Sequence, residues 1–239
     1  AAGPLFPPPL ADGHGLHGRG GPVDILGRTI PMKIVHFGKF YPPEYGGIES
    51  VTEALAEDHA AAGHDVEVVC FSRNAHRVDR QGSLTVRRVT ARIKKSSQPL
   101  AASYLIACAG ASRNADVVHV HSPNLLAALA VLRVPRRTRV VVHWHADIEG
   151  KGVLGHLVRP IERAMLRRAD RVVVTSDAYA AASPALAPFG DRIEVIPIGI
   201  SDLEGAPVPE EAPRPYVLFV GRLVPYKGLP VLLDAIAKV

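Results

Sequence analysis

The sequence predicts an α/β fold in which a largely parallel sheet is covered by helices on both faces. From Met32 onward, short apolar runs alternate with segments of helical periodicity. The apolar runs are strand-sized and nearly continuous, which is typical of parallel strands that are buried on both sides. The chain has 239 residues, 47% of them hydrophobic, which suffices for one full domain and part of another.

The first elements follow this alternation. A buried strand is expected at Lys33–Phe37, and a Pro/Gly loop leads from it into a helix. The apolar residues of that helix recur on one face between Ile48 and Ala62, and Gly63 supplies a favourable end. Two further strands are expected at Asp65–Phe71 and Ser83–Val89.

The remaining elements continue to the end of the first domain. The pattern predicts strands at Asp116–His121, Arg139–His145, Arg171–Thr175 and Arg192–Pro197. It predicts helices at Ala101–Gly110 and Asn124–Leu132, one that runs through about Arg168, and one at Ala178–Leu186. Pro160 either kinks the third of these helices or lies in its first turn.

The chain divides by composition into four segments. Residues 1–31 contain six prolines and seven glycines and read as a disordered or upstream extension. Residues 32–200 form the first domain, and the Pro- and Glu-containing segment 201–215 reads as a linker. Residues 216–239, with a strand at Tyr216–Val220 and a helix from Leu229, read as the truncated start of a second domain.

Charge and cysteine content narrow the functional classes. The net charge of +5 and the pI of about 9.4 fit nucleic acid, an anionic membrane, phosphorylated substrates or simply a solvated Arg-rich surface. No helix-turn-helix or aromatic-basic platform is recognisable, so we expect no nucleic-acid partner. No apolar run reaches the ~20 residues of a membrane span, so we expect a cytoplasmic enzyme. Cys70 and Cys108 read as two buried thiols, although a disulfide between them stays open.

The loop after the first strand carries a pair of glycines. Neither GxGxxG nor GxxxxGK[ST] is present, but Gly46 and Gly47 directly precede the first helix. Glycines at this position let backbone N–H groups approach a phosphate at the positive end of the helix dipole. The same pair is also compatible with a simple turn.

Two HxH pairs occur near strand ends, His119 with His121 and His143 with His145. Residues i and i+2 of a strand face the same side, so each pair converges on one place. Three interpretations stay open: a four-histidine metal site, packing at strand ends, or a cleft in which His145 donates a hydrogen bond. No carboxylate or cysteine set completes a metal site, so we expect no metal.

A basic pair follows the segment YVLFV, with Arg222 and Lys227 on either side of a β–α turn. A guanidinium fork and a mobile ammonium suit a pyrophosphate. Two exposed cations on a solvated turn are the alternative.

Six segments occur together in one order: MKIVHFGKFYPPEYGGIES, DVVHVHSP, HWHADI, RADRVVVTS, VIPIGI and LFVGRLVPYKG. From Met32 to Val239 the chain thereby resembles the family 4 retaining glycosyltransferases, and most of all their mannosyl- and rhamnosyltransferase branch. The resemblance implies a GT-B fold, made of two Rossmann-like domains. It also implies transfer of a hexose, of mannose or rhamnose type, from a GDP- or UDP-linked sugar with retention of configuration.

The same resemblance assigns roles to individual residues. It implies that His145 is catalytic and lies near the transferred sugar, and that the donor diphosphate is held by Gly46, Gly47, Arg222 and Lys227. Weaker positioning roles fall to Glu49 and Asp147. The paired-glutamate motif of the family is expected beyond Val239, so this chain is expected to hold half of the cleft and the acceptor side, without a complete donor site. Beyond the donor sugar, no cofactor and no metal are expected.

The expected acceptor is a saccharide or a lipid-linked acceptor of polysaccharide biosynthesis. Arg159, Arg163 and Arg167 recur every four residues and share a helix face, which fits peripheral contact with an anionic inner-membrane face or a solvated surface. A non-catalytic fragment that binds nucleotide or acceptor is the alternative. A nicotinamide-dependent oxidoreductase is disfavoured because GxGxxG is missing.

Overall fold

The computed structural model describes residues 30–91, 93–95, 98–147, 152–199, 216–221, 223 and 227–238. The chain divides into two compact units, residues 1–198 and 199–239. The predicted linker 201–215 and nearly all of the predicted extension 1–31 lie outside the described residues, so both stay predictions.

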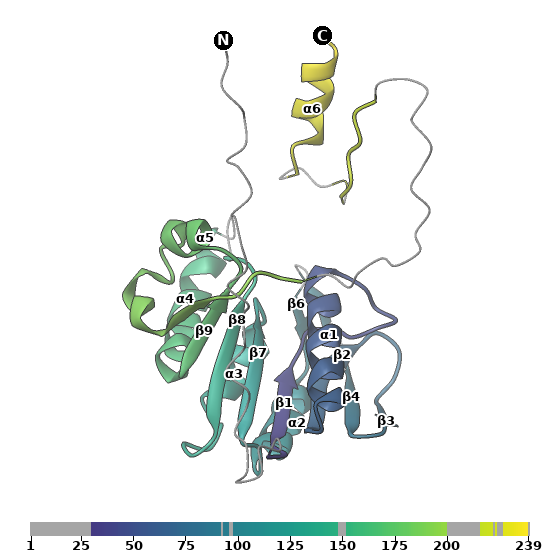
Figure 1. Ribbon diagram of the computed structural model, residues 1–239, viewed down its shortest axis with the longest axis vertical. Coiled ribbons are helices and arrows are strands. Elements are labelled where there is room, and N and C mark those ends of the chain that lie inside the picture. The colour runs from purple at the N-terminus through teal and green to yellow at the C-terminus, as the bar shows by residue number, and fades with distance from the viewer. Residues whose placement is uncertain are drawn as a thin grey trace, which may run out of the picture. The chain divides into compact units, whose positions relative to one another are not determined.

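The first unit is built on one eight-stranded sheet with the strand order β10-β9-β8-β7-β1-β2-β4-β3 (Figure 1). All neighbouring strands are parallel except β3, which pairs antiparallel with β4 at the edge. The strands are β1 (Lys33–Phe37), β2 (Asp65–Ser72), β3 (Arg77–Gln81), β4 (Leu84–Thr90), β7 (Val117–Ser122), β8 (Arg139–Trp144), β9 (Arg171–Val174) and β10 (Ile193–Val195). The predicted parallel α/β fold is confirmed for this unit.

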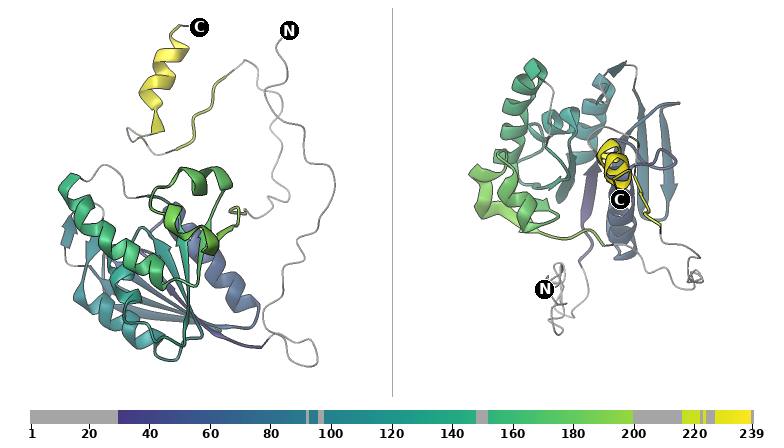
Figure 2. Two further views of the ribbon diagram at one scale, coloured as in Figure 1. Left: turned by 90° about the vertical axis from the view of Figure 1, so that its left-hand side faces the viewer. Right: turned by 90° about the horizontal axis from the view of Figure 1, so that it is seen from above.

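Helices cover both faces of the sheet (Figure 2). Helix α1 lies on one face, and α2, α3 and α4 lie on the other, where α3 packs against both of its neighbours. The helices are α1 (Gly47–Ala61), α2 (Ala102–Ser112), α3 (Leu125–Val131), α4 (Gly152–Arg168), α5 (Asp177–Ala182) and the 3₁₀ segment η1 (Ala187–Arg192). No helix among the described residues is both long and apolar enough to cross a membrane.

Local sequence explains several helix ends. The side chains of Asn124 and Ser176 each accept a hydrogen bond from the backbone N–H three residues on, and they cap α3 and α5. Gly63 follows α1 with φ of +91°, a conformation that residues with a Cβ rarely adopt. Pro160 lies inside α4 and not in its first turn, which settles the alternative that the sequence left open.

Strand β3, which pairs with the predicted strand β4, and the hairpin of β5 and β6 were not predicted. Strand β3 is rich in charged residues, and its pairing with β4 is held in part by a hydrogen bond from Arg88 Nε to Asp79 Oδ2, at 3.0 Å. Strands β5 (Ile93–Lys95) and β6 (Gln98–Leu100) form a separate two-stranded sheet. Strands β3, β5 and β6 lack the apolar runs that identify buried strands, and β3 lies at the edge of the sheet, where it is not buried on both sides.

The core follows the alternation of side chains along the strands. Odd-numbered positions of β1, such as Val35 and Phe37, pack toward α2, α3 and α4, together with Trp144 of β8. Val66, Val68 and Cys70 of β2 face the other way and pack with Ala56 of α1. Cys70 and Cys108 are both free and buried, as the sequence indicated.

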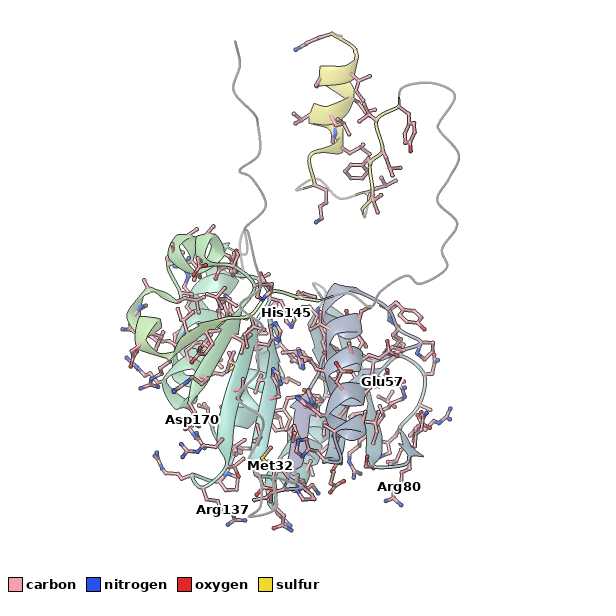
Figure 3. All side chains as sticks on the ribbon, in the orientation of Figure 1. Met32, Glu57, Arg80, Arg137, His145 and Asp170 are labelled. Carbon is pink, nitrogen blue, oxygen red and sulfur yellow. The ribbon has the colours of Figure 1, made fainter. Side chains whose placement is uncertain are left out.

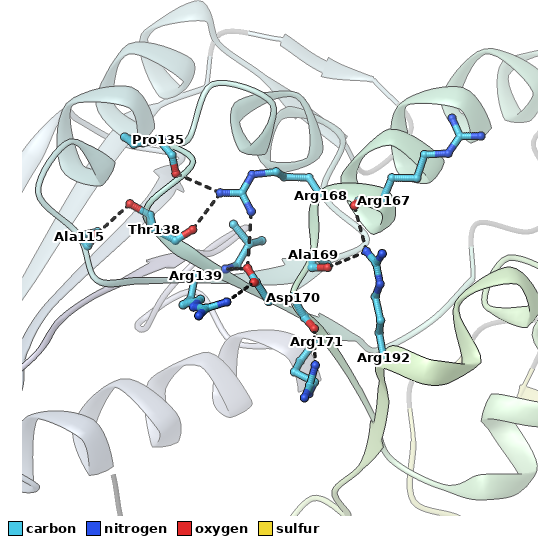
Figure 4. Close-up of polar contacts among 11 residues, drawn as sticks. Ala115, Pro135, Thr138, Arg139, Arg167, Arg168, Ala169, Asp170, Arg171 and Arg192 are labelled. Carbon is cyan, nitrogen blue, oxygen red and sulfur yellow. Dashed lines mark hydrogen bonds and ion pairs between the residues drawn. The ribbon is translucent and has the colours of Figure 1, made fainter. Parts of the chain in front are cut away.

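An arginine network fastens α4 to the start of the neighbouring strands (Figure 4). The Arg168 guanidinium donates to the carbonyl oxygens of Pro135 and Thr138, at 3.0 and 2.8 Å. Asp170 accepts from the backbone N–H of Val140 at 2.8 Å and from Arg139 Nη1 at 2.9 Å. These bonds lie where β8 and β9 begin, at the edge of the sheet opposite the end of β8.

The second unit departs from the sequence prediction at its start. Residues 216–220 were expected to form a buried strand, which is wrong for this structure: the segment pairs with no described residue, and Tyr216, Val217, Leu218 and Val220 are exposed. A β-strand needs a neighbour that accepts its hydrogen bonds, and the described part of this unit contains none. Helix α6 (Leu229–Ile236) does form where expected, after Gly228 with φ of +68°.

Candidate functional site

The candidate site lies at the edge of the sheet where the parallel strands end. Strand β1 ends at Phe37, β7 at Ser122 and β8 at Trp144, and His145 directly follows β8. Figure 3 places His145 at this edge, while Met32 and Arg137 lie at the opposite end of the strands. Ligands of doubly wound sheets bind at the carboxyl ends of strands, so His145 stands on the side where chemistry is expected.

The loop between β1 and α1 is fastened to its neighbours at several points. The Gly38 carbonyl accepts hydrogen bonds from Tyr104 Oη at 2.8 Å and from Asn124 Nδ2 at 2.9 Å. The Arg88 guanidinium donates to the carbonyl oxygens of Tyr41 and Pro42, at 3.1 and 2.6 Å. These contacts come from α2, from the start of α3 and from β4, so the loop is fixed from three elements.

The glycine pair forms the beginning of helix α1. Gly46 is the N-cap residue with extended backbone, and its carbonyl accepts from the N–H of Ser50 at 2.9 Å. A Cβ at Gly46 would collide with the Glu49 carboxylate, whereas one at Gly47 would meet no atom within 4 Å. The first-turn N–H groups of a helix have no intrahelical partner. The exposed Gly47 therefore leaves this N-terminus open to an anion, and Glu49 lies beside it.

His145 is a neutral hydrogen-bonding group in this structure. Its backbone N–H donates to the Ser122 carbonyl at 3.0 Å, and its Nε2 lies 3.2 Å from Nδ1 of His121. Burial, and next the neighbouring His143, lower its pKa to about 3. At neutral pH the ring therefore carries no charge, and it can donate or accept one hydrogen bond at Nδ1.

Asp147 fastens the end of β8 to helix α5. Its Oδ1 accepts from the Trp144 indole N–H at 3.0 Å and from Ser183 Oγ at 2.8 Å. Ser183 is the residue that ends α5, so one carboxylate joins a strand end to a helix end. These contacts place Asp147 two residues from His145 in a supporting position, which is compatible with the predicted positioning role.

The structure brings more histidines together than the sequence indicated. His36 of β1 pairs in register with His119 of β7, and His121 pairs with His143 of β8, so both HxH pairs and His36 share one face of the sheet. His59 of α1 covers this row, with its ring 5.3 Å from that of His36. We call the set His36, His59, His119, His121, His143 and His145 the histidine face.

Burial keeps the histidine face uncharged. Burial lowers the pKa of His36 to about 3, with His59 and His143 adding to the effect, and it lowers the pKa of His143 to about 4. Burial and neighbouring histidines also hold the pKa values of His119 and His121 well below the ordinary value. By distance alone, two trios have ring nitrogens within 4.8 Å of one another: His36 with His119 and His121, and His121 with His143 and His145.

Sequence reasoning did not include His36 and His59 in the site. The only signal was that His36 lies within a predicted buried strand. Its side chain points to the face of the sheet opposite to that of Val35 and Phe37. Its contact with His121 spans 85 residues and depends on the strand order, which no local pattern contains.

The predicted basic pair falls in the second unit. Arg222 lies outside the described residues, and Lys227 is exposed immediately before Gly228 and helix α6. Both residues belong to the second unit, whereas His145 and the glycine pair belong to the first. Their roles toward a donor diphosphate stay predictions.

Comparison with known proteins identifies the family. The model of the glycosyl transferase 4-like domain matches residues 46–199, which run from the start of helix α1 through strand β10. The chain belongs to this family.

Its curated relatives are sugar transferases. The chain is 32% identical over 216 residues to the D-rhamnosyltransferase WbpZ of Pseudomonas aeruginosa, covering 86% of this chain and 56% of that protein. It is 30% identical to the O-antigen chain mannosyltransferase C of Escherichia coli, covering 85% and 57%. It is also 30% identical to a GDP-mannose:cellobiosyl-diphosphopolyprenol alpha-mannosyltransferase of Xanthomonas oryzae, covering 83% and 54%.

The chain thus spans about half the length of the curated relatives that it matches. Among solved structures, the catalytic domain of starch synthase IV from Arabidopsis thaliana, bound to ADP and acarbose, aligns with a TM-score of 0.47 and 13% identity. That alignment covers 72% of this chain and 52% of the other.

Proposed function

We propose that the protein transfers a hexose, of mannose or rhamnose type, from a nucleotide-diphosphate sugar to a saccharide or lipid-linked acceptor, with retention of configuration. The observation that carries this proposal is the family match over residues 46–199, joined to relatives named as rhamnosyl- and mannosyltransferases. The relative that uses GDP-mannose and a diphosphopolyprenol acceptor supports a GDP-linked donor and a lipid-linked acceptor.

The strand-edge geometry fits such a reaction. Departure of the nucleoside diphosphate leaves negative charge on its phosphates, and the open N-terminus of α1 at Gly46 and Gly47 would stabilise that charge. Arg222 and Lys227 are proposed to neutralise the same phosphates from the second unit, without a divalent ion or a further cofactor. Glu49 is proposed to yield its place beside Gly46 to the incoming phosphate.

His145 is proposed to support the transferred sugar by a hydrogen bond from or to Nδ1, and not to act as a nucleophile. Its lowered pKa keeps the ring neutral, so it contributes a directional hydrogen bond rather than a charge. Asp147 is proposed to fix the strand end on which this ring stands, through its bonds to Trp144 and Ser183.

Replacement of His145 tests this role. In the full-length enzyme, His145→Ala is expected to lower kcat by about 10²-fold, the loss that follows removal of one strong transition-state hydrogen bond. The measurement is release of GDP or UDP coupled to transfer onto a lipid-linked saccharide. Near-wild-type turnover would exclude an important role for His145. Nucleotide binding without any transfer would favour the alternative of a non-catalytic binding protein.

Membrane contact is proposed for the outer face of α4. Arg159, Arg163 and Arg167 are all exposed there. Three arginines near an anionic surface each add about 1 kcal/mol of attraction, which suits a cytoplasmic enzyme that works at the inner membrane face on a lipid-linked acceptor. Co-sedimentation with vesicles should rise with the fraction of anionic lipid and fall when all three residues are changed to Gln. Binding that does not depend on anionic lipid would contradict this proposal.

A further inference from the structure

Four histidines of the histidine face form a continuous chain of hydrogen bonds. His145 Nε2 lies 3.2 Å from His121 Nδ1. His121 Nε2 lies 3.1 Å from His36 Nδ1, and His36 Nε2 lies 3.2 Å from His59 Nδ1. Each inner ring therefore uses both of its nitrogen atoms, one toward each neighbour.

The rings are aligned for these hydrogen bonds. The centroids of His121 and His145 are 5.5 Å apart, and those of His36 and His121 are 5.4 Å apart. In both pairs, the difference between the centroid separation and the N···N distance corresponds to the two ring radii. The nitrogen atoms therefore lie almost on the line that joins the centroids, with ring planes only 16° and 21° apart. A shared N–H points straight at its acceptor in such a pair.

The same alignment argues against a metal ion in either trio. A metal ligand must direct its lone pair at the ion, and two ligands of one ion meet there at an angle. The ring nitrogens of His121 and of both its chain neighbours instead face each other, and in each pair one donates its N–H and the other accepts. His119 Nε2 and both ring nitrogens of His143 have no hydrogen-bond partner in the described structure, and these two rings stand outside the chain.

The two inner rings of the histidine chain are buried, and its two end rings are in contact with solvent. His36 and His121 have no exposed surface, whereas His145 at the strand edge and His59 on α1 are both partly exposed. A proton cannot reach the middle of this sheet face through water, but it can pass from ring to ring, because each neutral imidazole holds one proton and one free lone pair.

We propose that His145, His121, His36 and His59 form a proton relay between the strand edge where the candidate catalytic histidine stands and the partly exposed His59 in the last turn of helix α1. Two uniform arrangements satisfy all three hydrogen bonds: every ring is protonated at Nε2, or every ring is protonated at Nδ1. When a proton binds Nδ1 of His145, the Nε2 proton of each ring passes to Nδ1 of the next ring. The Nε2 proton of His59 leaves to solvent, so the charge is unchanged.

The relay defines whether Nδ1 of His145 carries a proton, and it allows that proton to be gained or lost through the other rings. The chain of contacts stands without any assumption about the reaction, whereas its use in sugar transfer rests on the proposed function. His121, His36 and His59 are positioning residues in that scheme, because they act on the site through His145.

Nitrogen NMR on the ¹⁵N-histidine-labelled chain tests the relay without any transfer assay. We expect one common tautomer for His36, His121 and His145, and N–N couplings across the His36–His121 and His121–His145 hydrogen bonds. We also expect the buried His36 ring proton to exchange with solvent about tenfold more slowly in His59→Phe, which closes one end of the chain at a half-exposed site. His121→Phe, which breaks the middle, should abolish both couplings.

Matched controls come from the same face. His119→Phe and His143→Phe change buried rings that lie outside the chain, and each should leave the couplings and the exchange rate as in the unaltered protein. Alternating tautomers, missing couplings in the folded protein, or unchanged exchange in His59→Phe would overturn the relay. Stoichiometric Zn²⁺ binding that shifts His121 together with His119 or His143 would also overturn it, in favour of a metal site. Should His121→Phe fail to fold, the couplings of the unaltered chain and the His59→Phe exchange rate still decide the question.

Discussion

The two faces of the same three strands have opposite chemistry. Toward α2, α3 and α4, strands β1, β7 and β8 present valines, Phe37 and Trp144, and that face is an ordinary apolar core. On the other face, these strands and the residue that directly follows β8 carry five histidines, which occupy neighbouring positions on adjacent strands. Burying a valine side chain stabilises a fold by about 1.5–3 kcal/mol. Leaving a buried polar atom without a partner costs about 1–3 kcal/mol.

The apolar face stabilises the fold, whereas the histidine face carries the groups that are available for function. The apolar face would serve any parallel α/β domain, whereas the histidine face buries ring nitrogens of His119 and His143 that have no hydrogen-bond partner in the described structure. His143 makes the point most clearly, because it is only 5% exposed and neither of its ring nitrogens has a partner. Positions that lower stability are expected at functional sites. The histidine face has such positions and reaches the candidate catalytic residue His145, so we interpret it as a functional surface.

Acid should affect the two faces most differently. The pKa values of His36, His143 and His145 lie near 3 to 4 in the folded protein, against about 6.5 in an unfolded chain. The unfolded chain therefore binds more protons below pH 6.5, so stability is complete above that pH and is lost as the pH falls toward 4. Each such histidine contributes a slope of up to about 1.4 kcal/mol per pH unit, so several kcal/mol should be lost between pH 7 and pH 5.

Urea unfolding at pH 7, 6 and 5 measures this loss. The variant His143→Phe should make the decline less steep, because one of the buried titrating groups is removed. Val142→Ala should lower stability by the same amount at every pH. A free energy of unfolding that is flat across this range would show that the histidines are charged or exposed in the folded protein.

Two neighbouring residues of β8, Val142 and His143, allow the contributions of the two faces to stability to be compared at constant pH. Val142 is fully buried on the apolar face, and Val142→Ala should lower the free energy of unfolding by about 2 kcal/mol because it leaves a cavity. His143→Phe keeps an aromatic ring on the histidine face and removes two unpartnered nitrogens, so it should raise stability by about 1 kcal/mol. Both values come from chemical denaturation at pH 7. Equal losses from the two changes would mean that the faces contribute to stability in the same way.

Much of the first unit could be predicted from its sequence because its buried strands are strong local signals. Apolar runs located β1, β2, β7, β8 and β9, and Gly63 marked the end of α1. The edge strand β3 was missed since its residues are mostly charged and polar. The segment Tyr216–Val220 was misassigned because an apolar run indicates burial, while a strand also requires a partner that accepts its hydrogen bonds.

The candidate site was predictable only in part. The i, i+2 spacing correctly placed each HxH pair on one side of its strand, and the loop-to-helix junction located the glycine pair. That both pairs and His36 are neighbours on one face follows from the order β8-β7-β1 and from the strand register, which are properties of the whole sheet. The links from Asp147 to Ser183 and from Arg88 to Tyr41 likewise join segments that no local pattern relates.

The anchoring of the loop before α1 bears on how a donor would be received. Arg88, Tyr104 and Asn124 hold three carbonyl oxygens of this loop, so the approach to Gly46 and Gly47 is shaped before any ligand arrives. A ligand that binds there does not have to order the backbone, and the conformational entropy of that segment is lost once, during folding. Each round of binding and release can then leave the loop unchanged; under the proposed function, discrimination among donor sugars would fall to groups outside this loop.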